Sequence, residues 1–404
     1  MQTQAVEAAD ARASAQQRFA TIRNEMHLQG IDVLICFKPQ NTFHLSAFNP
    51  IFYSNPVIAI VPLDTEPILL VHAIRSDPAH ASSRIKNVRL YGAWGDKVTE
   101  AADWLSAVVS ILSGLKLEHS SLGVDLDYLP AAMARFLESA VPRARIVDTS
   151  PILNASRFVK NSEEISAMRA AAELSDIGMR AAAEVVAARG TERAVSVAAV
   201  NAMNDAWSAG FGEFTTADFG NSEGAIHSGL WSYCLTGDRV AQNCDNSSSR
   251  PLVDGDLAMV HIFSICNGMH AENERIFAVG TVSEEARRVY ETLLEARHSI
   301  FERLRPGITC GEACSDVASI YRRNGYEALL PGRMGHGLGL AAHEAPFLAS
   351  SDTTDLTPGM VLTVEPSLRV PALGGGGGQH SDMVLITETG FEFLTQFQRN
   401  FVQA

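Results

Sequence analysis

Cysteine is scarce in this 404-residue sequence, and long hydrophobic runs are missing from it. The six cysteines are scattered and none forms a C-x-x-C pair, which argues against the common structural zinc motifs and predicts reduced thiols. Apolar runs such as 57–63 and 67–74 are too short, and too interrupted by proline or histidine, to cross a bilayer, which takes about 20 residues. The first 19 residues lack the apolar core of a secretory signal, so we expect a cytoplasmic protein without a membrane partner.

Basic residues are also fewer than acidic residues. The chain carries 46 acidic and 32 basic residues, a formal net charge of −14, which argues against nucleic acid as the main partner. Hydrophobic residues make up 46% of the sequence and charged residues 19%, which is typical of a compact globular protein and excludes general disorder. A small-molecule substrate is compatible with this balance.

The first 155 residues follow the pattern of a three-layer α/β domain. Short apolar runs at 32–36, 57–61 and 68–71 are typical of buried strands, and helical patterns at 97–115 and 129–140 lie among them. Asn161, with Glu164 three residues later, is a capping-box signal at the start of a long alanine-rich helix. We therefore expect two domains, 1–155 and 156–404.

The order of elements changes in the second part. Helices are expected at 162–188, 193–209, 283–304 and 310–324, and strands at 256–266, 268–279, 360–370 and 382–388. Helices and strands in separate blocks predict an α+β layout rather than a parallel sheet of alternating units. The five glycines at 374–378 are interpreted as a flexible connection rather than as a backbone-lined ligand loop.

Side chains able to act as acids, bases or ligands recur through this second part. Alternation along a strand places Glu272 and Glu274 on one face, where they either repel each other, which raises the pKa of one, or share a cation, unless that face is simply a solvated hairpin surface. His336 lies between glycines, where a ligand can approach the backbone, and Glu365 comes at the end of an apolar strand, just before a proline. The candidates are His261, His270, Glu272, Glu274, Arg275, His336, His343, Glu344, Glu365, His380 and Asp382.

Three motifs together resemble a known family. GHGLG at 335–339 followed by His-Glu-x-Pro at 343–346, PGMVLTVEP at 358–366 and DMVLITETG at 382–390 look like the creatinase, prolidase, aminopeptidase P and methionine aminopeptidase family. The resemblance implies a C-terminal "pita-bread" domain from about residue 150 onward and a creatinase-like N-terminal α/β domain. It also implies a homodimer.

The resemblance further implies five metal-ligand positions, which here hold His261, Glu272, His336, Glu365 and Ser381. Three of them depart from the family pattern of two aspartates, a histidine and two glutamates. Because two divalent ions need bridging carboxylates, a dinuclear centre is not expected. A single ion held by His261, Glu272, His336 and Glu365 stays open, since imidazole and carboxylate suit zinc or manganese, but no cofactor is the main expectation.

The expected function follows the creatinase branch of this resemblance. Glu274 precedes Arg275, as a substrate-contacting glutamate does in creatinases, so we expect a hydrolase of a non-peptide C–N bond in a small nitrogenous metabolite, like creatinase or ectoine hydrolase. Cys244 falls at a position where the resemblance implies a histidine, and His227 could take over the role of that histidine. The segment 46–56 lacks the arginine that binds the substrate carboxylate in creatinases. The expected catalytic residues are His336, His343, Glu365 and Glu274, and the expected substrate-binding residues are His261, Glu272, Arg275, His227, Phe52, Tyr53 and His380.

Two alternatives remain at this point. The first is a metal-dependent Xaa-Pro aminopeptidase or prolidase with a one-metal site, which metal analysis and chelation would separate from the metal-free hydrolase. The second is a non-catalytic pita-bread binding module. The presence of His336, His343 and Glu365 argues against this module, because a pocket without chemistry does not need them.

Overall fold

The computed structural model describes residues 16–404 except 51, 212–213, 220–227, 243 and 371–375. The described residues form two compact units. The first contains the chain up to Arg157 together with Asp218 and Phe219, and the second contains Phe158–Ala217 and residues from Ser228 to the C-terminus. Among the described helices, none combines the length and apolar character that a membrane span requires.

The first unit is built on a six-stranded mixed sheet with the order β4-β3-β2-β1-β5-β6. Strand β1 pairs antiparallel with β2 and parallel with β5. The strands are β1 (Val33–Cys36), β2 (Ile58–Pro62), β3 (Ile68–His72), β4 (Asn87–Tyr91), β5 (Ser121–Val124) and β6 (Arg145–Asp148). The helices are 16–28, α2 (Pro39–Ser46), η1 (Ala73–Arg75), α3 (Ser76–Ser82), α4 (Trp104–Gly114), α5 (Ala131–Ala140) and α6 (Ser150–Ala155).

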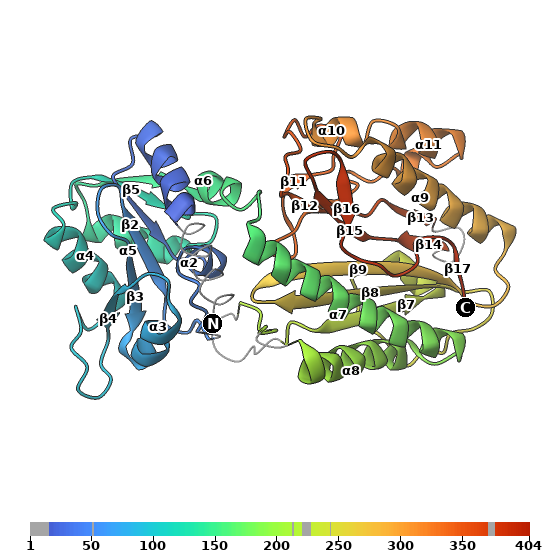
Figure 1. Cartoon of the computed structure of the whole chain (residues 1–404), viewed down its shortest axis with the longest axis horizontal. Coiled ribbons are helices and arrows are strands. Elements are labelled where there is room, and N and C mark those ends of the chain that lie inside the picture. Colours follow the sequence, from blue (N-terminus) through green and yellow to red (C-terminus); the bar gives the residue numbers. More distant parts are fainter. Residues whose placement is uncertain (1–15, 51, 212–213, 220–227, 243, 371–375) are drawn as a thin grey trace, which may run out of the picture. The chain divides into compact units, whose positions relative to one another are not determined.

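This sheet is buried on both faces, because alternate residues of each strand enter different hydrophobic clusters. Leu34 and Cys36 pack with α2, α3, α6 and helix 16–28, whereas Val33 and Ile35 pack with α4 and α5. Strands that are covered on both faces are expected to be continuously apolar, as the central strands β1 and β2 are, whereas the edge strands β4 and β6 contain charged residues. The three-layer α/β architecture expected for the N-terminal part is confirmed (Figure 1).

The second unit contains three sheets, with the orders β17-β9-β8-β7, β11-β10-β12-β15-β16 and β13-β14. Its strands are β7 (Trp231–Thr236), β8 (Leu257–Cys266), β9 (Met269–Ala278), β10 (His336–Gly337), β11 (Glu344–Phe347), β12 (Val361–Val364), β13 (Ser367–Val370), β14 (Gly376–Gln379), β15 (Asp382–Ile386), β16 (Phe391–Phe393) and β17 (Val402–Gln403). Its helices are α7 (Ser162–Ala187), α8 (Glu192–Gly210), η2 (Gly237–Gln242), α9 (Glu284–Arg303), α10 (Cys310–Ala313), α11 (Val317–Arg323) and η3 (Glu327–Leu329).

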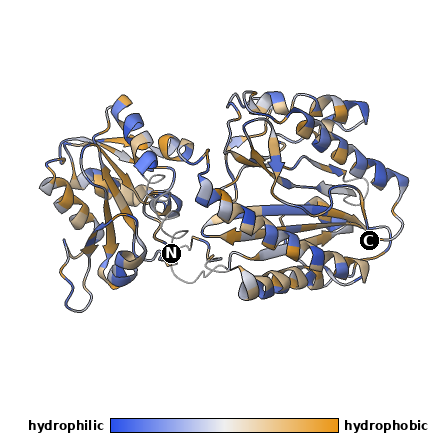
Figure 2. Ribbon diagram, viewed as in Figure 1, coloured by the Kyte–Doolittle hydropathy of each residue, from blue (hydrophilic) through white to orange (hydrophobic). Residues whose placement is uncertain are grey.

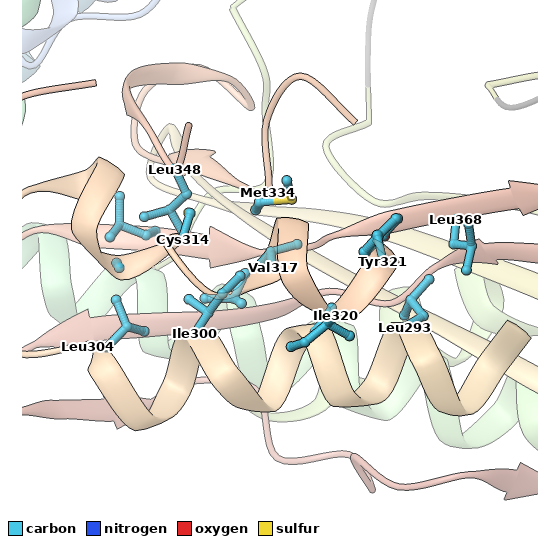
Figure 3. Packing of buried hydrophobic residues seen from close by; sticks show 14 of the residues in the cluster. Leu293, Ile300, Leu304, Cys314, Val317, Ile320, Tyr321, Met334, Leu348 and Leu368 are labelled. Atoms are coloured by element: carbon cyan, nitrogen blue, oxygen red, sulfur yellow. The ribbon is translucent and has the colours of Figure 1, made fainter. Parts of the chain in front are cut away.

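The helices of this unit cover its sheets from two sides. Helices α7 and α8 pack on the sheet of β7, β8 and β9, and α9 packs with α11 and with the β13-β14 pair (Figure 1). Strands β8, β12 and β15 are predominantly hydrophobic, β9 contains a hydrophilic stretch, and the helices combine hydrophobic and hydrophilic residues (Figure 2). Figure 3 shows Leu293 and Ile300 of α9 beside Val317 and Ile320 of α11 in the core. The α+β class and the two-domain architecture are confirmed.

Local sequence signals explain where key elements begin and turn. The capping box of α7 is confirmed: Glu164 N donates to Asn161 Oδ1 (2.9 Å), and Asn161 N donates to Glu164 Oε2 (3.0 Å). Strands β8 and β9 form a hairpin through Asn267 and Gly268, both with positive φ, as a tight two-residue turn requires.

The glycine-rich segment differs from the expectation of a flexible connection. Its first two glycines lie outside the described residues, but Gly376–Gly378 belong to β14 and pair with β13. Gly377 has φ +127°, and a Cβ there would lie 1.9 Å from the carbonyl oxygen of Leu368. The two strands therefore approach too closely for any side chain at this position.

Candidate active site

The β8-β9 hairpin places several candidate residues on one face of its sheet. His261 lies opposite Glu274, and Phe263 lies opposite Glu272, so all four side chains point to the same side. Asn273 points to the other side, where its amide donates to Asp176 Oδ1 of α7 (2.9 Å). The alternation predicted from the sequence is confirmed.

His261 is held by two polar contacts. Its Nδ1 lies 2.6 Å from Glu274 Oε1 and 2.7 Å from the hydroxyl oxygen of Tyr233, which β7 places directly opposite. The exposed fractions are only 6% for His261 and 1% for Glu274. This hydrogen-bonded group is therefore fixed inside the protein rather than on a solvated hairpin surface.

A second set of side chains comes from β10 and from the end of β12. His336 Nε2 lies 3.1 Å from Glu365 Oε1 and 3.6 Å from Glu272 Oε2, and all three residues are buried. His336 Nδ1 is 2.9 Å from the carbonyl oxygen of Gly337, which can only accept, so Nδ1 carries the proton. The Nε2 atom is therefore the one directed at the carboxylates, as in a metal-ligating histidine with a fixed tautomer.

The electrostatics reflect this crowding of carboxylates. Burial and the neighbouring Glu365 raise the pKa of Glu272 well above its ordinary value. Burial also disfavours the charged form of Glu365, but the charge of His336 and its hydrogen bond hold the pKa of Glu365 below its ordinary value. Burial and the charge of His336 lower the pKa of His343 to about 4, so this imidazole is neutral near pH 7. A cation between these groups would relieve the repulsion.

The donor set fits a divalent metal ion. Three buried ligand-type atoms of this group, His261 Nε2, Glu274 Oε2 and Glu365 Oε2, have no hydrogen-bond partner among the described residues, while His336 Nε2 faces the carboxylates of Glu365 and Glu272. Such orphaned atoms are rare in protein interiors, and imidazole nitrogen and carboxylate oxygen are the usual ligands of zinc and manganese. Two groups have ligand atoms within 4.8 Å of one another: Glu272 with His336 and His343, and His261 with Glu272 and Glu274. The expectation of no metal is therefore unsupported.

His261, Glu272, Glu274, His343 and Glu365 line a cavity of about 1060 Å³ in the second unit, and His336 is buried behind them. His343 is exposed, and its ring centroid is 4.3 Å from that of His336. Two arginines and several aromatic rings also line the cavity, and the rings of Trp231 and Phe263 stack 5.6 Å apart. The described lining residues are Trp231, Tyr233, Cys244, His261, Phe263, Glu272, Glu274, Pro331, Gly332, Arg333, His343, Phe347, Ala349, Ser351, Asp352, Thr353, Glu365, Ser367, Arg369 and Gln379.

Several residues expected at the site lie elsewhere. All five N–H groups of Arg275 are engaged, one by Asp382 and four by backbone carbonyls, so none is left for a substrate. His380 is fully buried beside Tyr290 and does not line the cavity.

Phe52, Tyr53 and His227 were also expected to bind the substrate. Tyr53 belongs to the core of the first unit, and Phe52 is half-buried in the same unit. His227 lies outside the described residues.

Other lining residues were not expected from the sequence. Trp231 and Tyr233 alternate along β7, and this alternation was the available signal, but only the pairing of β7 with β8 shows that they face His261. Arg333, in a loop before β10, and Arg369, on β13, had no such signal. Cys244 lies at the cavity, with its sulfur 4.0 Å from the hydroxyl of Tyr233.

Comparisons with known proteins agree over nearly the whole chain. The sequence profile of metallopeptidase family M24 matches residues 166–388, and that of the creatinase/prolidase N-terminal domain matches residues 18–159. The Xaa-Pro dipeptidase of Pyrococcus furiosus is 27% identical over 387 residues, 96% of this chain and 99% of the relative. A protein of Bacillus subtilis described as "Putative dipeptidase YkvY" is 26% identical over 370 residues, 90% of this chain and 93% of the relative.

Solved structures give the same picture of the fold. The prolidase from Pyrococcus furiosus has a TM-score of 0.75 at 26% identity, covering 93% of this chain and 99% of that chain. The Xaa-Pro dipeptidase from Bacillus anthracis has a TM-score of 0.80 at 21% identity, covering 96% of this chain and all of that chain.

These findings overturn the expected reaction. The relatives that align along the whole chain are dipeptidases, which cleave peptide bonds, so the expectation of a hydrolase acting on a non-peptide C–N bond is wrong. The likeness to amidohydrolases such as ectoine hydrolase is likewise unsupported. The error came from treating three changed ligand positions as the loss of the metal centre, although His261 and Glu272 still present ligand atoms there.

Proposed function

Because the chain belongs to metallopeptidase family M24, with the creatinase and prolidase type of N-terminal domain, we propose that it is a metal-dependent dipeptidase acting on Xaa-Pro dipeptides. The observation that carries this proposal is the group of three buried glutamates and two buried histidines whose ligand atoms converge beside a cavity. The Xaa-Pro dipeptidase of Pyrococcus furiosus, which aligns along almost its full length, supports the substrate class.

The residues that would hold one divalent ion are His261, Glu272, His336 and Glu365. When bound, such an ion supplies Lewis-acid polarisation of a peptide carbonyl and an activated water at neutral pH. Around that chemistry, the protein's own groups keep their positions through hydrogen bonds that the structure already contains. Tyr233 orients His261, and the carbonyl of Gly337 orients His336.

His343 is suited to direct contact with a substrate. It lies beside His336 at the exposed side of the group, and its lowered pKa of about 4 leaves it neutral at pH 7. A neutral imidazole can donate a hydrogen bond to a substrate carbonyl.

The rest of the cavity offers contacts for the two ends of a dipeptide. Arg369 lines the cavity and donates through Nη2 to Gln379 Oε1 (3.1 Å), so its guanidinium can also bind a substrate carboxylate. The stacked rings of Trp231 and Phe263 provide a flat apolar wall for a proline ring. The expected homodimer stays a prediction.

Hydrolysis of Leu-Pro and Met-Pro by metal-free protein, with and without added Mn²⁺, Co²⁺ or Zn²⁺, tests the proposal. We expect turnover only with metal, and a loss of at least about 100-fold in His336→Ala. The matched control is His298→Ala, an exposed histidine of α9 that should keep full activity. Absence of Xaa-Pro hydrolysis with every metal, or turnover that survives chelation, would refute the proposed function.

A further inference from the structure

A buried ion pair between Lys160 and Glu344 lies next to the turn that carries His343. We propose that Lys160 is a positioning residue, which acts through Glu344 to hold the turn 337–344 so that the imidazole of His343 stays beside His336 at the cavity. This inference rests on the proposed function and deepens it, because it names the residues that keep His343 in place for a substrate.

The choice of a lysine at position 160 is unusual in this chain. Lys160 is the only lysine from residue 117 to the C-terminus, a stretch that otherwise uses arginine. Its side chain is 2% exposed, and the side chain of its partner Glu344 is 4% exposed. Burial of a charged side chain is costly unless the charge is paired, so a lysine here indicates a specific use of its compact ammonium group.

The backbone of Lys160 is fixed to the segment that leads into β12. Its N–H donates to the carbonyl of Gly359 (2.9 Å). Its ammonium group donates to the carbonyl of Phe158 (3.3 Å) and lies 3.8 Å from Glu344 Oε2. Because β12 ends just before Glu365, the lysine is anchored to the strand that delivers a candidate metal ligand.

Glu344 connects the ammonium group to the turn. Its other carboxylate oxygen, Oε1, accepts from the N–H of Ala341 (3.0 Å), two residues before His343. The backbone of Glu344 pairs with Gly337 between β10 and β11. Glu344 therefore ties the middle of the turn to both of its ends.

Gly339 lies at the centre of the same contacts. A Cβ at this position would lie 2.7 Å from Glu344 Oε2 and 3.2 Å from Lys160 Cε, so the ion pair packs directly against the glycine. The carbonyl of Gly339 accepts from the N–H of His270 on β9 (2.8 Å) and lies 2.9 Å from His270 Nδ1. The turn is thus held by β9 through this carbonyl and by the Lys160–Glu344 pair at the glycine Cα.

The position of His343 depends on this turn. His343 is exposed at the cavity, and its ring centroid is 4.3 Å from that of His336. Glu344 is the next residue in the chain, so the contacts that fix Glu344 also fix the backbone that carries the imidazole. Because a buried ion pair adds little stability compared with a packed apolar pair, the main contribution of Lys160 is this geometry.

A double-mutant cycle on the full-length protein loaded with Mn²⁺ tests this role. Lys160→Met should lower kcat/KM for Leu-Pro at least about tenfold, and His343→Ala should lower it at least as much. Because the lysine acts through His343, the double variant should fall no more than about twofold below His343→Ala. The matched control is Arg322→Met, which removes an exposed ion pair with Glu327 and should leave kcat/KM unchanged.

Carbethoxylation by diethyl pyrocarbonate, followed by peptide mass spectrometry, examines His343 without any substrate. In Lys160→Met the rate at His343 should change at least about threefold, because the turn that holds it is loosened. The rate at His298, an exposed histidine of α9, should stay the same. Losses of kcat/KM that multiply in the double variant, or an unchanged rate at His343, would overturn the inference.

A variant that does not fold by circular dichroism is replaced by a milder one. Glu344→Gln removes the charge of the pair and keeps an oxygen for the N–H of Ala341, and the same outcomes then decide. If the unchanged protein hydrolyses no Xaa-Pro dipeptide, the proposed function is refuted, while the carbethoxylation rates still decide the role of Lys160.

Discussion

The carboxylate of Asp382 balances several buried positive charges, and its removal should strongly destabilise the second unit. Asp382 is fully buried and lies 2.7 Å from Arg275 Nη2, 3.2 Å from Arg297 Nη1 and 3.4 Å from Arg399 Nε. Asp382→Asn keeps the shape of the side chain but leaves these guanidinium groups without their counter-charge. Breaking a buried pair in this way typically costs about 3–5 kcal/mol.

Thermal unfolding measures this effect. For a unit of this size, about 3–5 kcal/mol corresponds to a fall in Tm of roughly 6–20 °C. The matched control is Asp254→Asn, which removes an exposed pair with Arg189 (2.9 Å) and should change the free energy of unfolding by less than about 1 kcal/mol. If the two variants lose similar stability, the reasoning that Asp382 is a buried counter-charge is refuted.

The pH dependence gives a second check on the same residue. Burial alone would raise the pKa of Asp382, but the three arginines hold it below its ordinary value. A carboxyl group with a lowered folded-state pKa stabilises fully above its unfolded pKa, about 3.9, and loses this contribution as the pH falls through the folded-state value. The stability difference between the unchanged protein and Asp382→Asn should therefore be constant from pH 6 to 8 and shrink below about pH 4.

Three further predictions concern the backbone, the substrate and the metal. Gly377→Ala should destabilise the protein by at least about 3 kcal/mol in urea unfolding, because its Cβ meets the carbonyl of Leu368, whereas Gly390→Ala, with open space around it, should stay within about 0.5 kcal/mol. Arg369→Gln should lower kcat/KM for Xaa-Pro dipeptides about 10- to 100-fold and leave the corresponding dipeptide amides nearly unaffected; an equal loss for both would contradict carboxylate recognition. Mn²⁺ at 100 times its Kd should stabilise the folded protein by about 2.7 kcal/mol, and an unchanged Tm after chelation would contradict a metal site.

Features that depend on neighbours in the sequence could be predicted. The capping box at Asn161, the strand pair 256–266 and 268–279, and the opposite orientation of Glu272 and Asn273 follow from local periodicity and side-chain chemistry. The same holds for the long helices, whose observed ends lie within one or two residues of those expected for α7, α8 and α9.

Features that depend on pairing between distant strands could not be predicted. The sequence indicates that the side chains of Trp231 and Tyr233 point to the same face of a strand. Only the register between β7 and β8 shows that Tyr233 lies opposite His261. The sequence predicts Arg275 as a substrate-binding residue. In the structure, its guanidinium donates instead to Asp382 and to four backbone carbonyls. Gly377 of β14 packs closely against the backbone of β13, and a run of five glycines in the sequence does not by itself indicate this contact.

The mistaken reaction has the same physical origin. When each ligand position is compared separately, Ser381 counts as the loss of a carboxylate ligand, and His261 counts as the loss of a carboxylate that could contribute to a dinuclear centre. A metal ion, however, requires donor atoms at suitable distances, whichever strand supplies them. In an antiparallel sheet, residues that lie opposite each other point to the same side, and Glu274 lies opposite both Ser381 and His261.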